Sequence, residues 1–111
     1  LGTAFWAPER CFRQWGFETR LVFDRKKFDK ALDCADAAIV FYHWAGKKGL
    51  GAHFVALEKT DTGIRGYNTY RDSGGPDDWG RSLEAFLRKR GYFGCVLLAI
   101  RKKGGENIEI G

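Results

Sequence analysis

Two side chains in the middle of the chain have the types and spacing of a general base and the group that orients it. His53 lies near the start of residues 51–58, and Asn68 ends residues 63–68. An imidazole can take a proton from a nucleophile, and an amide oxygen that accepts a hydrogen bond from the ring fixes its tautomer and orientation. The pair therefore predicts half of a nucleophilic catalytic site, provided that the fold brings both residues together.

A β-hairpin would bring them together. The turn-forming residues 60–63 separate two β-prone runs, which is the usual hairpin pattern. Because the two strands run antiparallel, the first residues of one lie beside the last residues of the other. We therefore predict a hairpin over residues 52–68. It should place His53 and Asn68 within hydrogen-bond reach or one water apart, at one end of a sheet and open to a groove.

The remaining elements alternate along the chain in the order α-β-α-β-β-β-α-β. Before the hairpin we expect helix 8–15, strand 18–23, helix 24–35 with Asp24 as N-cap, strand 37–44 and loop 45–51. Residues 37–44 are almost all apolar, which predicts a central strand covered on both faces. After the hairpin we expect loop 69–76, a helix from Asp77 or Asp78 to Arg90 ended by Gly91, strand 92–100, and a short edge strand at Ile108 and Ile110.

This order predicts an α+β fold with a twisted, mainly antiparallel sheet flanked by about three helices. The 111 residues show no repeat, linker or low-complexity segment, so we expect a single domain over residues 1–111. The chain contains no methionine and begins at Leu1, which suggests that it is part of a longer protein.

Residues 38–44, 51–57 and 66–68 together resemble the C-terminal half of a papain-like cysteine peptidase, and most of all the bacteriocin-processing (double-glycine leader) peptidases and their relatives. The resemblance extends over about residues 17–100. It implies that His53 matches the catalytic histidine, which opens a central strand in a His-Phe-Val run. It also implies that Asn68 matches the third catalytic member, and that the substrate is a peptide or protein.

The same resemblance requires a nucleophilic cysteine at a helix N-terminus upstream, and no residue of the chain matches it. Cys11 lies in a short predicted helix, Cys34 lies late in another, and Cys95 lies inside an apolar strand. We therefore predict that none of the three is the partner of His53 and that none forms a disulfide within the chain. Peptide cleavage would then need a cysteine from an upstream segment or a second chain.

Two functions other than catalysis remain open. A non-enzymatic protein- or peptide-binding module could use a groove near His43, Trp44 and His53. A nucleic-acid-binding domain could use the basic clusters at residues 20–30, 47–48, 88–90 and 101–103, since the net charge is +5. A solvated basic surface explains these clusters more simply. The cysteine and histidine spacings predict no metal site and no cofactor, and no apolar run is long enough to span a membrane.

Overall fold

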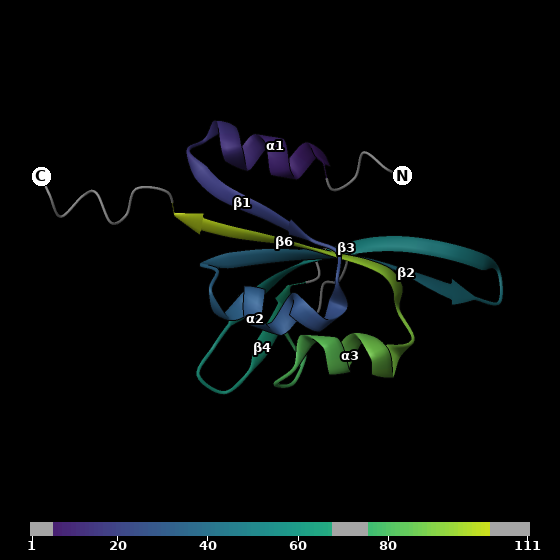
Figure 1. Ribbon diagram of the computed structural model, residues 1–111. Coiled ribbons are helices and arrows are strands. Elements are labelled where there is room, and N and C mark those ends of the chain that lie inside the picture. The colour runs from purple at the N-terminus through teal and green to yellow at the C-terminus, as the bar shows by residue number, and fades with distance from the viewer. Residues whose placement is uncertain (1–5, 68–75, 103–111) are drawn as a thin grey trace, which may run out of the picture.

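A twisted six-stranded antiparallel sheet organises the α+β fold in the computed structural model, which describes residues 6–67 and 76–102 (Figure 1). The strand order is β1-β6-β2-β3-β4-β5, and every neighbouring pair is antiparallel. The strands are β1 (Phe17–Val22), β2 (Ala37–Gly46), β3 (Gly49–Lys59), β4 (Ile64–Tyr67), β5 (Asp77–Asp78) and β6 (Phe93–Lys102). The α+β class predicted from the sequence is therefore confirmed.

The helices begin and end at local signals, most of which the sequence already shows. They are α1 (Trp6–Gln14), the 3-10 turn η1 (Arg25–Lys27) followed by α2 (Phe28–Asp33), and α3 (Leu83–Arg90). Asp24 caps η1, because its carboxylate accepts a hydrogen bond from the Lys26 amide at 3.0 Å. Gly91 ends α3 in the left-handed conformation, with a φ of 74°.

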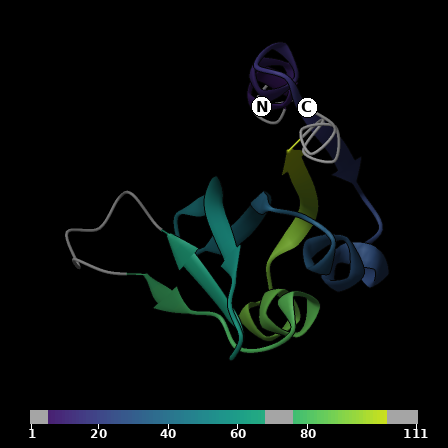
Figure 2. The same cartoon turned by 90° about the vertical axis from the view of Figure 1, so that its left-hand side faces the viewer.

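The sheet has two differently covered faces. We call them the α1 face and the α2/α3 face after the helices that pack on them, and α1 lies apart from α2 and α3 in both views (Figures 1 and 2). On β2, Val40 and Tyr42 belong to the core beneath α2 and α3, whereas Phe41 belongs to the smaller core beneath α1. Since successive side chains of a strand alternate between faces, the apolar run of β2 supplies both cores, as predicted for a central strand.

The β2–β3 hairpin is longer than the sequence predicts. Residues 45–51 were expected to form a loop, but the pairing continues to Ala45↔Leu50 and Gly46↔Gly49. The two strands are therefore joined by the two residues Lys47 and Lys48, and Gly49 has a φ of 125°. Pairing between the two backbones does not require their side chains to be buried, so the strands can extend beyond the helices (Figure 1).

The next hairpin follows the prediction. Its turn is closed by hydrogen bonds from the Thr60 amide to the Gly63 carbonyl (2.7 Å) and from the Gly63 amide back to Thr60 (3.3 Å). Strands β3 and β4 then pair from Lys59↔Ile64 to Ala56↔Tyr67. The predicted edge strand at Ile108 and Ile110 lies outside the described residues, as does most of the predicted loop 69–76.

The predicted start of the last helix was wrong. Asp77 and Asp78 form β5 against β4, and the Trp79 amide donates to the Ile64 carbonyl at 2.9 Å. Helix α3 starts only after Ser82, whose hydroxyl accepts from the Ala85 amide at 3.2 Å. The Asp29 carboxylate of α2 also accepts from the first two amides of the helix. A carboxylate distant in sequence therefore helps to fix where α3 begins.

Candidate functional site

His53 lies on the α2/α3 face of the sheet and is half-buried. It is the cross-strand partner of Tyr42, and the two rings meet edge to face with their centroids 5.9 Å apart. Tyr42 is buried and stacks in turn on Tyr92, at 4.0 Å between centroids. We call the stacked rings of Tyr42 and Tyr92 the aromatic wall. Because the core holds this wall in place, it limits the position of the His53 imidazole on that side.

The hydroxyl of Tyr42 stays protonated to unusually high pH. Burial raises its pKa above the ordinary value of 10.0, and the neighbouring Tyr92 raises it further. The wall beside His53 is therefore neutral over the whole physiological range. It can orient the ring by contact without adding a charge.

The position of His53 along β3 matters as much as its neighbours. Val55 and Leu57, the next residues on the same face, are buried in the core beneath the helices. Ala52 and Phe54, which flank His53 in sequence, are exposed. The imidazole thus lies where the hairpin emerges from the helix-covered core. It combines a fixed backbone with a side chain that a second molecule or segment can reach.

Asn68, the predicted partner of His53, lies outside the described residues, which end on this side of the gap at Tyr67. The last described pair of the β3–β4 ladder is Ala56↔Tyr67. The proposed contact between His53 and Asn68 therefore stays a prediction. What the structure supports is the element that the contact requires, an antiparallel hairpin whose second strand leads into Asn68.

The structure separates the two residues named for a binding groove. Trp44 lies on the α2/α3 face with His53, and its ring covers Gly51, where a β-carbon would come within 2.2 Å of a ring atom. His43 lies on the α1 face, with its ring 5.8 Å from that of Phe93. A groove on one face can therefore contain Trp44 and His53, but His43 belongs to the other face.

The three cysteines occupy three separate places, and all are free thiols. Cys11 is exposed on α1, which covers the face opposite to His53. Cys34 is exposed just after α2 and lines a pocket beside β1. Cys95 is buried in β6, and desolvation raises the pKa of its thiol. A buried thiol that holds its proton is a poor nucleophile.

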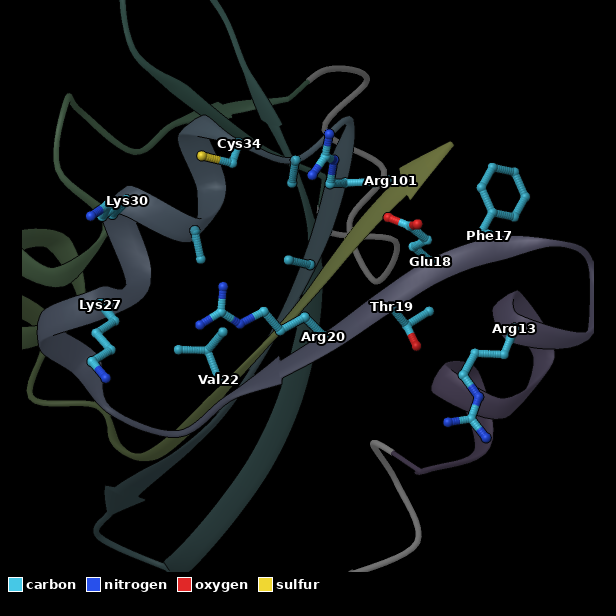
Figure 3. Close-up of a pocket in the computed structure, with 13 residues that line it drawn as sticks. Arg13, Phe17, Glu18, Thr19, Arg20, Val22, Lys27, Lys30, Cys34 and Arg101 are labelled. Carbon is cyan, nitrogen blue, oxygen red and sulfur yellow. The ribbon is translucent and has the colours of Figure 1, made fainter. Parts of the chain in front are cut away.

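A basic pocket between β1 and α2 is a feature that the sequence did not reveal as one site. Its volume is about 900 Å³, and its lining includes Arg20, Lys27, Lys30 and Arg101. The side chains of Arg20 and Arg101 project from the sheet into the space beside α2 (Figure 3). Arg20–Lys30 and Arg101–Lys103 are separate basic clusters in the sequence. The pairing of β1 with β6, which matches Glu18 with Arg101 and Arg20 with Ala99, brings them together.

Two further features bear on what the chain can do. Within residues 6–67 and 76–102, no group of three or more histidine, cysteine, aspartate or glutamate side chains is placed to hold a metal ion. In the same part of the chain no helix has the length and apolar character needed to cross a membrane.

A comparison with known proteins adds no family to this description, because the chain matches no protein-family model and no curated protein.

Proposed function

We propose that this chain is the sheet-bearing half of a papain-like cysteine peptidase, in which His53 is the general base. The observation that carries the proposal is the position of the imidazole. It is half-buried at the point where β3 leaves the core and lies edge-on against the buried Tyr42 at 5.9 Å. A base must be held in place and yet be reachable by the group that it deprotonates.

The nucleophile in this proposal is a cysteine that is not among the three of the chain. Cys11 and His53 are associated with opposite faces of the sheet, Cys34 lies beside β1, and Cys95 is buried. An upstream segment or a second chain would place a cysteine, at a helix N-terminus, beside His53. The imidazolium and the helix dipole would then both stabilise its thiolate.

Peptide cleavage would follow the usual order for such a pair. The thiolate attacks the scissile carbonyl, the imidazolium returns its proton to the leaving amine, and water hydrolyses the resulting thioester. In this scheme Asn68 accepts a hydrogen bond from the ring and fixes its orientation. A histidine and an amide without a thiolate cannot form the acyl intermediate, so we expect no peptidase activity from the 111 residues alone.

The test compares the 111-residue chain with the same chain joined to its natural upstream neighbour, using a peptide substrate that contains a Gly-Gly cleavage site. Cleavage by the joined protein should vanish with His53→Ala and weaken with Asn68→Ala. His43→Ala is the matched control, because it also removes an imidazole, but from the neighbouring strand β2 and from the opposite face of the sheet. Cleavage by the 111 residues alone that survives His53→Ala would exclude the mechanism.

A binding module on the same scaffold is the second candidate, and the part of the β2–β3 hairpin that extends beyond the helices favours it. Trp44, Leu50 and Phe54 are all exposed there, and Phe93 is exposed beside His43. Neighbouring exposed apolar side chains are typical of a surface that another protein covers. A joined protein that binds the Gly-Gly peptide through this hairpin without cleaving it would favour this alternative.

A further inference from the structure

The outer edge of β1 is open. β1 is the first strand of the sheet and pairs only with β6. Among the residues that the structure describes, no other segment forms a backbone hydrogen bond with β1. An edge of this kind presents unpaired N–H and C=O groups that can pair with an added strand.

The basic pocket follows this open edge. Its lining includes Glu18 and Arg20, which face α2, and also Phe17 and Thr19, which face α1. Since successive side chains of a strand point to opposite faces, a cavity that touches both sets extends along the edge of the strand. The pocket is thus a trough beside the unpaired backbone of β1, with α2 on one side (Figure 3).

Positive charge dominates the α2 side of this trough. Arg20 comes from β1, Lys27 from η1, Lys30 from α2 and Arg101 from β6, and all four are exposed. None of the four makes an ion pair with another described residue. Glu18 is the one carboxylate in the lining. Small residues, among them Ala31 and Ala99, leave open space between the cations.

The nearby aspartates do not neutralise these cations, because each is engaged elsewhere. Asp24 caps η1 and Asp29 caps α3. Asp33 pairs with Lys59, and Asp36 accepts from the Lys102 amide at 2.7 Å. Four carboxylates between residues 24 and 36 thus serve the fold, while Lys27 and Lys30 of the same segment line the trough.

We propose that this trough binds an acidic peptide segment, which adds to the sheet as a strand beside β1. The peptide backbone would pair with the open edge. Side chains at every second position would point towards α2, so carboxylates spaced i, i+2 would meet Arg20, Lys27, Lys30 and Arg101. This inference is independent of the proposed peptidase function, since β6 and β2 separate β1 from the strand of His53.

The structure favours a peptide over a nucleic acid for this trough. A single strand of nucleic acid would use exposed aromatic rings for base stacking. The one aromatic residue of the lining, Phe17, instead packs on α1, with its ring 5.8 Å from that of Phe12. An unpaired strand edge complements a peptide backbone and has no counterpart in a nucleic acid.

The test uses a seven-residue peptide with glutamate at alternate positions and threonine or valine between them, titrated into the protein by calorimetry. Two comparison peptides separate the two parts of the proposal: glutamine in place of glutamate removes the charge, and backbone N-methylation removes the strand pairing. Both should bind markedly more weakly. Equal affinity for either comparison peptide, or no binding of the acidic peptide, would overturn the proposal.

Two double variants test the location with the same change in charge. Arg20→Gln with Lys30→Gln should weaken binding by roughly tenfold, as expected for two partly exposed charge pairs. Lys47→Gln with Lys48→Gln, at the tip of the β2–β3 hairpin, should leave binding almost unchanged. Equal losses from both variants, or tighter binding of a single-stranded oligonucleotide at the same salt concentration, would show that only general basic charge is involved.

The cysteines provide an independent readout of the same site. Cys34 is exposed and lines the trough, whereas Cys11 is exposed on α1 outside it. The acidic peptide should slow alkylation of Cys34 and leave that of Cys11 unchanged, as followed by mass spectrometry of proteolytic fragments. If the peptide leaves the alkylation rate of Cys34 unchanged, it binds elsewhere and the proposal is overturned.

Discussion

The two ends of the β2–β3 hairpin share one continuous ladder but differ in what covers them. Over residues 38–42 of β2, and at Val55 and Leu57 of β3, the side chains enter the cores beneath the helices. From His43 to Phe54 the same two strands continue with mostly exposed side chains. We call these the covered part and the projecting part. The comparison shows that strand pairing alone can extend a sheet beyond its core, and His53 lies at the boundary between the two.

The largest contrast is expected from two leucines of β3. Leu57 is 3% exposed in the covered part and Leu50 is 76% exposed in the projecting part. Leu57→Ala should lower the free energy of unfolding by about 2–5 kcal/mol, because it leaves a cavity in the core. Leu50→Ala should change it by about 0.5 kcal/mol or less. Urea denaturation of the two variants beside the unchanged protein measures both values.

Similar losses from the two leucine variants would contradict the comparison. They would mean that the projecting part is covered in solution, for example by another protein molecule. Repeating the Leu50→Ala measurement over a range of protein concentrations would reveal that case, since stability that depends on association changes with concentration.

A smaller contrast is expected from two glycines, each of which lies under a tryptophan ring. A β-carbon at Gly66 would come 2.4 Å from Trp79, and one at Gly51 would come 2.2 Å from Trp44. Trp79 is buried, at 6% exposure, and stacks on Phe86, whereas Trp44 is 43% exposed. Gly66→Ala should cost about 1–3 kcal/mol, as overpacking in a core does. Gly51→Ala should cost much less, because the Trp44 ring can move into solvent.

The readout for the glycine pair is again the midpoint of urea unfolding, together with near-ultraviolet circular dichroism. Gly51→Ala should change the aromatic spectrum through Trp44 while the midpoint stays almost constant. A large loss of stability from Gly51→Ala would indicate that the Trp44 ring is fixed in place, and the boundary of the covered part would then move outward to include it.

The sequence predicted the elements whose signals are local and missed those that depend on distant residues. Asp24 and Gly91 mark helix ends correctly because each acts on its own neighbours. The start of α3 was misplaced because Asp77 and Asp78 look as good a cap as Ser82. The partner that supports the observed start, Asp29, lies in another helix. The turn at Lys47 and Lys48 was missed because neither residue is a typical turn former.

The same distinction between local signals and distant residues applies to the candidate site. Its strand and the hairpin that follows it were predictable from residues 51–67 alone, and both are present. The wall that Tyr42 and Tyr92 form beside His53 was not predictable from these residues. It depends on the register of β2 with β3 and on Tyr92, which follows α3. The trough beside β1 likewise requires the pairing of β1 with β6, which no local pattern shows.

The smallest predicted effect concerns Tyr42, at the boundary beside His53. Its pKa in the folded protein lies above the ordinary 10.0, because burial and Tyr92 disfavour the charged form. Unfolded chains release this proton as the pH rises above 10, while folded chains keep it. The stability from the neutral Tyr42 is therefore complete below pH 10 and decreases above it, by at most about 1.4 kcal/mol per pH unit.

Tyr42→Phe removes this ionisation and retains the stacked ring, so its unfolding free energy should fall less steeply between pH 9 and pH 11. The difference between the two proteins over the same pH range isolates the contribution of Tyr42. Parallel pH profiles would mean that the hydroxyl reaches solvent in the folded protein. The wall beside His53 would then belong to the projecting part, and the imidazole would lose the fixed neighbour on which its role as a positioned base depends.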